Sequence, residues 1–162
     1  MPEARVAPAR VAIATVAALS AEQLEWHHRI RHQVFVTEQQ LFAPTDGDAH
    51  DLEPDAIRVL GLCASQPAGT VRLFPLDPGG ERWQGDRLAV LREFRACGLG
   101  KPLVRFAVAT AAALGGGEMV AHIQLANVSF FEHIGWRRNG PVELYVGVAH
   151  QPMVIGLTRS RP

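Results

Sequence analysis

The chain has 162 residues, of which 48% are hydrophobic and 20% charged, a composition typical of one globular domain, so we expect residues 1–162 to form a single domain. Lys plus Arg and Asp plus Glu number 16 each, so no excess of one sign indicates a nucleic acid or a membrane surface as partner. Cys63 and Cys97 are the only cysteines, too few for a disulfide scaffold, and they favour a reducing, cytoplasmic setting.

The N-terminal segment has the pattern of a core strand over Arg10–Ala17. A short signal peptide is the alternative, because Arg5 and Arg10 precede an apolar run. Glu3 and two prolines do not fit the start of such a peptide. No apolar stretch is long enough to cross a membrane.

A helix is predicted from Ser20 to about Glu38. Ser20 and Gln23 have the spacing of a capping box, in which each side chain satisfies a free amide at the helix start. The predicted buried stripe of this helix consists of Trp26, Ile30 and Val34. Residues 43–56 follow as a loop that contains two prolines, five carboxylates and one short helical turn.

The rest of the chain alternates strands with two helices. Strands are predicted at 57–63, 70–76, 83–91, 119–123, 142–148 and 153–157, and helices after residue 100 and at 127–134. This order predicts an α/β (α+β) fold, with a mixed central sheet of about six to seven strands flanked by helices. The unit Arg87–Ile123 is expected to be a right-handed parallel crossover.

The loop at 95–100 has the composition of an anion site. Gly98 and Gly100 let the backbone approach a ligand, Arg95 adds a charge, and the following helix presents free amides. A diphosphate fits this arrangement. A P-loop is excluded because Pro102 follows Lys101, and the dinucleotide fingerprint lacks its third glycine. The alternative is an ordinary glycine-containing turn before a helix, with no ligand-binding role.

The pattern R-x-x-G-x-G at 95–100, preceded by Leu88-x-Val90, resembles the acetyl-CoA signature of the GCN5-related N-acetyltransferase (GNAT) superfamily. The segments around Arg31-x-x-Val34-Phe35 and Asp48-x-x-Asp51 resemble its ElaA-like branch. The pattern through His150-Gln151-Pro152-Met153 is also similar to acetyltransferases associated with bacterial nitrilase gene clusters.

This resemblance implies acetyl-CoA as co-substrate and direct attack of a small-molecule amine on the thioester. Two strands would splay apart at a bulge, and the pantetheine arm would enter between them. An amide near Val90 would polarise the thioester carbonyl. The implied cofactor-binding residues are Leu88, Ala89, Val90, Arg95, Ala96, Cys97, Gly98, Leu99, Gly100, Lys101, Gln124, Asn127 and Phe131.

Three positions depart from the family pattern. Arg92 replaces a usual proline, and Ala96 replaces a usual glycine. Phe131 stands where many members have a tyrosine that protonates the departing thiolate, which a phenyl ring cannot do. Tyr145, the only tyrosine, can act as the acid only if the fold brings it near, and water is the other candidate.

The candidates for taking the amine proton are Glu38, His122 and the acidic-loop residues Asp48, His50 and Asp51. Glu38 ends the first helix, and the alternative for it is an exposed carboxylate or a pair with Arg31. His122 lies on the strand beside the expected cleft, and its alternative is a buried structural histidine. The acidic loop, including Asp48 and Asp51, is either solvated or attracts a cationic substrate. We expect no metal site, although His28 and His32 have the spacing to share an ion.

The leading interpretation is therefore an amine N-acetyltransferase, a monomer or homodimer with no nucleic-acid or membrane partner. A catalytically degenerate module that only binds acyl-CoA is the second interpretation, and Phe131 favours it. Acyl-homoserine-lactone synthesis is the third, because those enzymes share a related fold and a similar Arg-x-x-Val-Phe start.

Overall fold

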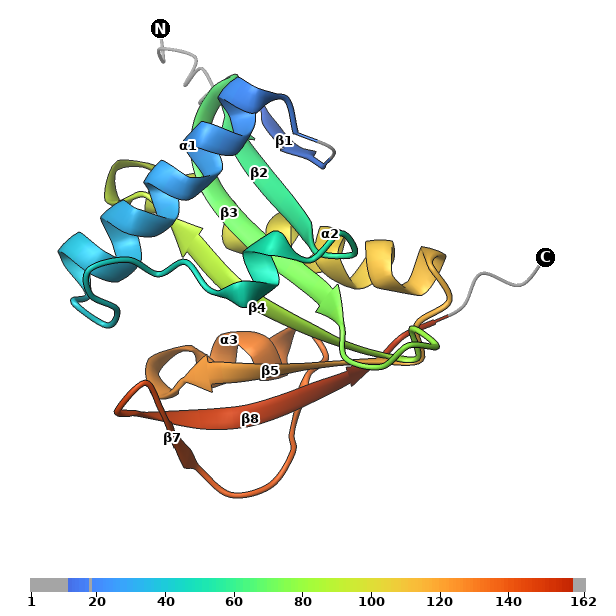
Figure 1. Cartoon of the computed structure of the whole chain (residues 1–162). Helices are drawn as coiled ribbons and strands as arrows, with labels where there is room; N and C mark the ends of the chain where they lie inside the picture. The colour runs from blue at the N-terminus through green and yellow to red at the C-terminus, as the bar shows by residue number, and fades with distance from the viewer. Residues whose placement is uncertain (1–11, 18, 159–162) are drawn as a thin grey trace, which may run out of the picture.

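The computed structural model describes residues 12–17 and 19–158 (Figure 1). Its strands are β1 Ile13–Val16, β2 Ile57–Cys63, β3 Gln66–Pro75, β4 Arg82–Val90, β5 Glu118–Gln124, β6 Arg137–Arg138, β7 Glu143–Tyr145 and β8 Val148–Gly156. Its α-helices are α1 Ala21–Arg31, α2 Gly100–Ala113 and α3 Val128–His133. Shorter helical segments are η1 His32–Glu38, a π-helix, and the 3₁₀ turns η2 Ala49–Leu52, η3 Arg92–Cys97 and η4 Leu125–Asn127. Arg10 and Val11 of the first predicted strand lie outside the described residues.

The strands form one mixed sheet in the order β1-β2-β3-β4-β5-β8-β6, with β7 paired to β8. All pairs are antiparallel except β4 with β5, which confirms the predicted parallel pairing across α2. The sheet has eight strands rather than six to seven, because the short β6 and β7 are separate strands. No helix in the described part of the chain is long and apolar enough to span a membrane.

Helices cover both faces of the sheet. In Figure 1, α1 lies in front of β2 and β3, whereas α2 and α3 lie behind the sheet. The larger core lies between the sheet and α2 and includes Leu103, Ala107 and Met119. The smaller core lies under α1 and includes Ile30 and Val34. We refer to the two sides as the α2 face and the α1 face.

The capping box at Ser20 and Gln23 forms as predicted, and the helix continues through α1 and η1 to Glu38. Its buried stripe is not as predicted, since Trp26 is 36% exposed. The inward positions are His27, Ile30, Arg31 and Val34, which follow the i, i+3, i+4, i+7 spacing of one helix face. Two of the four are polar, so a search for apolar residues alone misplaces the stripe.

The predicted strand at 142–148 is confirmed only in part, because β7 ends at Tyr145 and the chain reverses before β8 begins at Val148. Val146 and Gly147 both have left-handed φ values, 52° and 75°, and form a tight reversal between β7 and β8. Two consecutive residues with positive φ are typical of a two-residue hairpin turn. The reversal folds Tyr145 back beside Val148, its partner in the β7–β8 pair.

Candidate active site

The parallel strands β4 and β5 separate along their length. They pair only at Arg82–Gln84 and Glu118–Val120, and no further pairing between them occurs in the described structure. A bulge on β4 accompanies the separation, because Thr70 pairs with Ala89 but Arg72 pairs with Asp86. Arg87 in the bulge has a φ of 52°, in the left-handed region. The predicted splay at a bulge is therefore present.

A cavity of about 100 Å³ fills the gap between the two splayed strands. Its walls come from both faces of the sheet, so the gap connects the α1 face with the α2 face. On the α2 face they include Leu88, Val104, Ala107, Asn127, Phe131 and Trp136. On the α1 face they include Phe35, Phe42, Arg87, His122, Tyr145 and His150.

The α2 wall holds the side chains expected at the cofactor. Leu88 and Val90 pack toward the α2 core, while Ala89 between them packs under α1. The backbone of Ala89 and Val90 still pairs with β3 on one edge, which leaves the edge toward β5 without a strand partner. Phe131 is 5% exposed and packs edge-on against Trp136, so it is both core and cavity wall.

The loop before α2 is the segment expected to hold the diphosphate. Gly98 has a φ of 80°, and a Cβ added there would meet nothing within 4 Å. No side chain caps the first turn of α2, so amides at this helix start have no internal partner. Leu99 is 1% exposed, so only its backbone faces a ligand, whereas Gly100 and Lys101 begin the helix.

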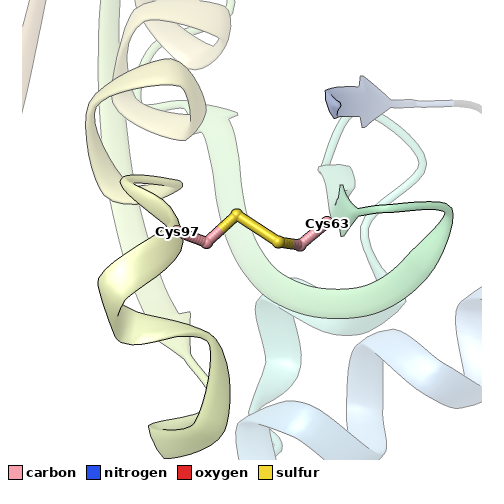
Figure 2. Close-up of a disulfide and its surroundings, with 2 residues drawn as sticks. All are labelled: Cys63 and Cys97. Carbon is pink, nitrogen blue, oxygen red and sulfur yellow. A yellow bond between two sulfur atoms is a disulfide. The ribbon is translucent and has the colours of Figure 1, made fainter. Parts of the chain in front are cut away.

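A disulfide joins Cys97 at the end of η3 to Cys63 at the end of β2 (Figure 2). The expectation of two free thiols is therefore wrong. The two residues lie 34 positions apart, and the fold brings them within a Cα–Cα distance of 6.8 Å. The bond anchors Cys97, one of the implied cofactor-binding residues, immediately before Gly98.

Arg95 and Glu38 meet at the edge of the gap. The Nη2 atom of Arg95 donates to Glu38 Oε1 at 2.5 Å, and its Nε donates to the Val90 carbonyl at 3.2 Å. Glu38 therefore pairs with Arg95, not with Arg31 as the alternative had it. Beside this pair, Gln124 Nε2 donates to Gln39 Oε1 at 2.9 Å. The end of η1 therefore contacts η3 through Arg95 and β5 through Gln124.

His122 and Tyr145 come together on the α1 wall. Their rings stack with centroids 4.9 Å apart and an interplanar angle of 4°. His122 Nδ1 lies 3.0 Å from Glu143 Oε1, but the directions do not make a hydrogen bond, and Nδ1 is buried without one. With a side chain 31% exposed, His122 is not the buried, hydrogen-bonded structural histidine of the alternative.

Three aspartates of the acidic loop pair with buried arginines, whereas Asp55 is exposed and the Glu53 side chain is 43% exposed. Three buried arginines, at Arg31, Arg72 and Arg87, bind four aspartates, at Asp46, Asp48, Asp51 and Asp86. Arg31 and Arg72 each have fully buried side chains. Such networks are retained only when every charge has partners, and truncating one partner is strongly destabilising. The loop is therefore first of all a structural element that shapes the α1 wall.

The pKa values in this network follow from those contacts. Burial opposes ionisation of Asp51, but hydrogen bonds from Arg31 outweigh it and hold its pKa below the usual range. Asp48 behaves alike, with Arg72 as its partner, and its pKa is also lowered. Because their pKa values are lowered, both carboxylates have little affinity for a proton, so neither is suited to act as the general base.

Sequence reasoning missed two residues of the α1 wall. Arg87 was read only as part of a strand, yet its Nη1 lies 3.5 Å from Tyr145 Oη, and its guanidinium lies over Phe42. His150 was noted only within a family pattern, yet it is 2% exposed and lines the cavity. The missing signal is the turn at Val146–Gly147, which lies within a segment predicted as one continuous strand. Recognising that turn would have indicated where Tyr145 and His150 lie.

The site thus has two splayed strands and a glycine loop before an uncapped helix. A family model described as the acetyltransferase (GNAT) family matches residues 19–136. The chain belongs to the GNAT family. It is thus an acyltransferase, and members of this family use an acyl-CoA as co-substrate.

Relatives of this GNAT protein span most of its length. It is 27% identical over 140 residues to the N-acetyltransferase YjcF of Bacillus subtilis (strain 168), covering 86% of this chain and 96% of YjcF. Escherichia coli ElaA shares the fold with a TM-score of 0.76 and 22% identity, over 89% of this chain and 98% of ElaA. BjaI, a CoA-dependent acyl-homoserine lactone synthase, shares it with a TM-score of 0.71 and 20% identity, over 92% of this chain and 84% of BjaI.

Proposed function

We propose that residues 1–162 form one N-acetyltransferase domain that transfers the acetyl group of acetyl-CoA to the amine of a small molecule. The observation that carries the proposal is the cavity between β4 and β5, whose walls come from both faces of the sheet. A thioester entering from the α2 face would meet an amine arriving from the α1 face. The amine would then attack the carbonyl directly, without an acyl-enzyme.

The cofactor would lie along the α2 wall. The free edge of β4 would pair with the pantetheine arm, and the loop with its arginine would hold the diphosphate (Arg95, Ala96, Cys97, Gly98, Leu99, Gly100 and Lys101). A diphosphate at a helix start gains from the amides and from the helix dipole. Gln124, Asn127 and Phe131 would close the other side of the arm. Arg95 would have to leave the Val90 carbonyl when the arm binds.

The amine would lie on the α1 wall, among aromatic rings and polar groups. Glu38 and His122 are base candidates that the sequence supplies, and Tyr145 is the candidate acid for the departing thiolate. The stack of Tyr145 on His122 supports a shared role of these two at the cavity. Phe131 remains without a proton to donate.

The test combines cofactor binding with turnover. Acetyl-CoA is titrated into the protein by calorimetry, and thiol release is followed with a panel of diamines, amino alcohols and amino acids. We expect binding and amine-dependent release. Folded protein that shows neither heat nor a thermal shift with any CoA thioester contradicts the proposal.

Two other functions have their own outcomes in this test. Tight acetyl-CoA binding with no turnover on any amine supports the binding module, which the lack of an acid at Phe131 favours. Turnover only with long acyl-CoA donors and S-adenosylmethionine supports lactone synthesis, the activity of BjaI.

A further inference from the structure

His150 is a buried imidazole in the wall of the cavity. It lies on β8, where it pairs with Gln124 of β5 on one side and with Glu143 of β7 on the other. The residue is 2% exposed and lines the α1 side of the gap. A polar side chain in this position is either satisfied by the protein or turned toward a ligand.

One ring nitrogen of His150 is occupied by the backbone. Its Nδ1 lies 2.8 Å from the Val148 carbonyl oxygen, which can only accept a hydrogen bond. Nδ1 therefore carries the proton, and in the neutral ring Nε2 carries a lone pair. Within residues 12–17 and 19–158, Nε2 has no hydrogen-bond partner.

Packing fixes the orientation of this ring. Tyr145 packs edge-on against it, with centroids 5.3 Å apart at 85°, and His122 stacks on Tyr145. The charged and titratable groups nearby are Tyr145 and Glu143 from β7, His122 from β5 and Arg87 from β4. A base held in one tautomer and one rotamer loses little freedom when it takes a proton.

Two base candidates from the sequence are less well placed. Glu38 already accepts a short hydrogen bond from Arg95 at the cofactor loop. His122 has its Nδ1 against the Glu143 carboxylate. Among the three, His150 alone has a hydrogen bond to the backbone that fixes its tautomer.

We propose that His150 Nε2 is the general base that removes the proton from the acceptor amine. The inference rests on the proposed function. The amine nitrogen forms a bond to the thioester carbon, and Nε2 takes one proton from that nitrogen. The carbon–sulfur bond then breaks with its electron pair on sulfur. The thiolate takes a proton from the acid, Tyr145 or water, which solvent replaces, and His150 releases one to solvent, so the products are the amide and free CoA.

Two variants separate this role from a structural one. In His150→Asn the side-chain amide can still donate to the Val148 carbonyl, but the basic nitrogen is lost. His150→Gln places an amide near the position of Nε2, where it cannot act as a base. His133→Asn, on the exposed end of α3, is the matched control.

The expected result is a fall in kcat of at least about 100-fold in both His150 variants, as for loss of a general base. The acetyl-CoA dissociation constant stays unchanged, and the acidic limb of kcat/KM against pH disappears. His133→Asn retains the wild-type rate and profile. If His150→Asn keeps both the rate and the acidic limb, the inference is overturned while the proposed function stands. Absence of turnover in the wild type on every amine removes the proposed function and this inference together.

A measurement without turnover tests the premise. In ¹⁵N NMR of the imidazoles, the resonances absent from His150→Asn belong to His150. We expect a protonated Nδ1 and an unprotonated Nε2 at pH values where the ring is neutral. A proton found on Nε2 instead overturns the inference, whatever the acceptor is.

Discussion

The Arg95 guanidinium bonds to the Glu38 carboxylate at 2.5 Å across 57 residues of sequence. The same guanidinium donates to the carbonyl of Val90, on the strand edge that the pantetheine arm is proposed to use. Arg95 thus links the end of η1 to the strand and the loop that form the proposed cofactor site. A ligand diphosphate would compete with Glu38 for this cation.

Replacing Arg95 by Ala should weaken acetyl-CoA binding about tenfold, because one charge-assisted hydrogen bond to phosphate is lost. The weakening should shrink at high salt, where charges at the surface are screened. Calorimetric titration at two ionic strengths measures both effects. Arg92→Ala is the matched control, since Arg92 is 76% exposed and lies 3.9 Å from the same carboxylate. An equal loss of affinity in both variants would show general charge attraction instead.

Gly98→Val should reduce acetyl-CoA affinity and leave the fold intact. The added side chain meets no protein atom, so the change acts through the φ of 80° and through the approach of the ligand. The backbone penalty is on the order of 1–2 kcal/mol. Gly140→Val is the control, because Gly140 also has a positive φ, 97°, and open space, but it lies outside the loop. We expect similar losses of thermal stability and a loss of binding only at Gly98. Wild-type affinity in Gly98→Val would contradict the diphosphate assignment.

Cys63→Ser should lower the free energy of unfolding by roughly 3–4 kcal/mol, the loop-entropy estimate for a cross-link spanning this separation. Urea unfolding measures the loss. Wild-type protein with a reductant should match the variant, and the variant itself should not respond to reductant. Two reactive thiols in the unfolded, unreduced wild type would contradict the disulfide.

Acid should destabilise the protein through His27 before it affects the aspartates. Burial, helped by the nearby Arg31 cation, lowers the pKa of His27 to about 3, whereas an unfolded histidine titrates near 6.5. Between these values the unfolded chain binds more protons than the folded one, so stability falls as pH drops from about 6.5 to about 3. The full loss is at most about 5 kcal/mol.

His27→Asn provides the control for this pH dependence. Its amide can replace the hydrogen bond from Nδ1 of His27 to the Val59 carbonyl, and it does not titrate. Urea unfolding between pH 4.5 and 7 should therefore show a much flatter pH dependence in the variant. Equal slopes would assign the effect to other groups. The folded state lowers the pKa values of Asp48 and Asp51. The stability that these two carboxylates contribute should therefore be lost only below about pH 4.

Tyr145→Phe should lower kcat about tenfold with unchanged acetyl-CoA affinity if the phenol protonates the thiolate. The ring stack on His122 does not need the hydroxyl, so the fold should remain. Steady-state kinetics with the best amine of the panel, beside calorimetry, separates the two quantities. An unchanged kcat would leave water as the acid.

Local signals in the sequence predicted most of the fold. The alternation of β4, the capping box at Ser20 and the glycine loop before α2 each depend on residues close together along the chain. The pairing of β4 with β5 followed from the crossover rule. Where the prediction failed, as at Trp26, the helix turned polar residues inward, which hydrophobic periodicity does not detect.

The sequence by itself determined the order of the elements and the proposed place of the diphosphate, because spacing within one segment fixes which backbone groups are free. Only the tertiary structure decided which distant side chains meet. The Cys63–Cys97 bond, the Arg95–Glu38 pair and the stack of His122 on Tyr145 join residues 34, 57 and 23 positions apart. A periodic pattern says which face of an element is buried, but it holds no information on the partner element or its register. Long-range contacts of this kind bring together the residues proposed to transfer protons, so the catalytic proposal required the tertiary structure.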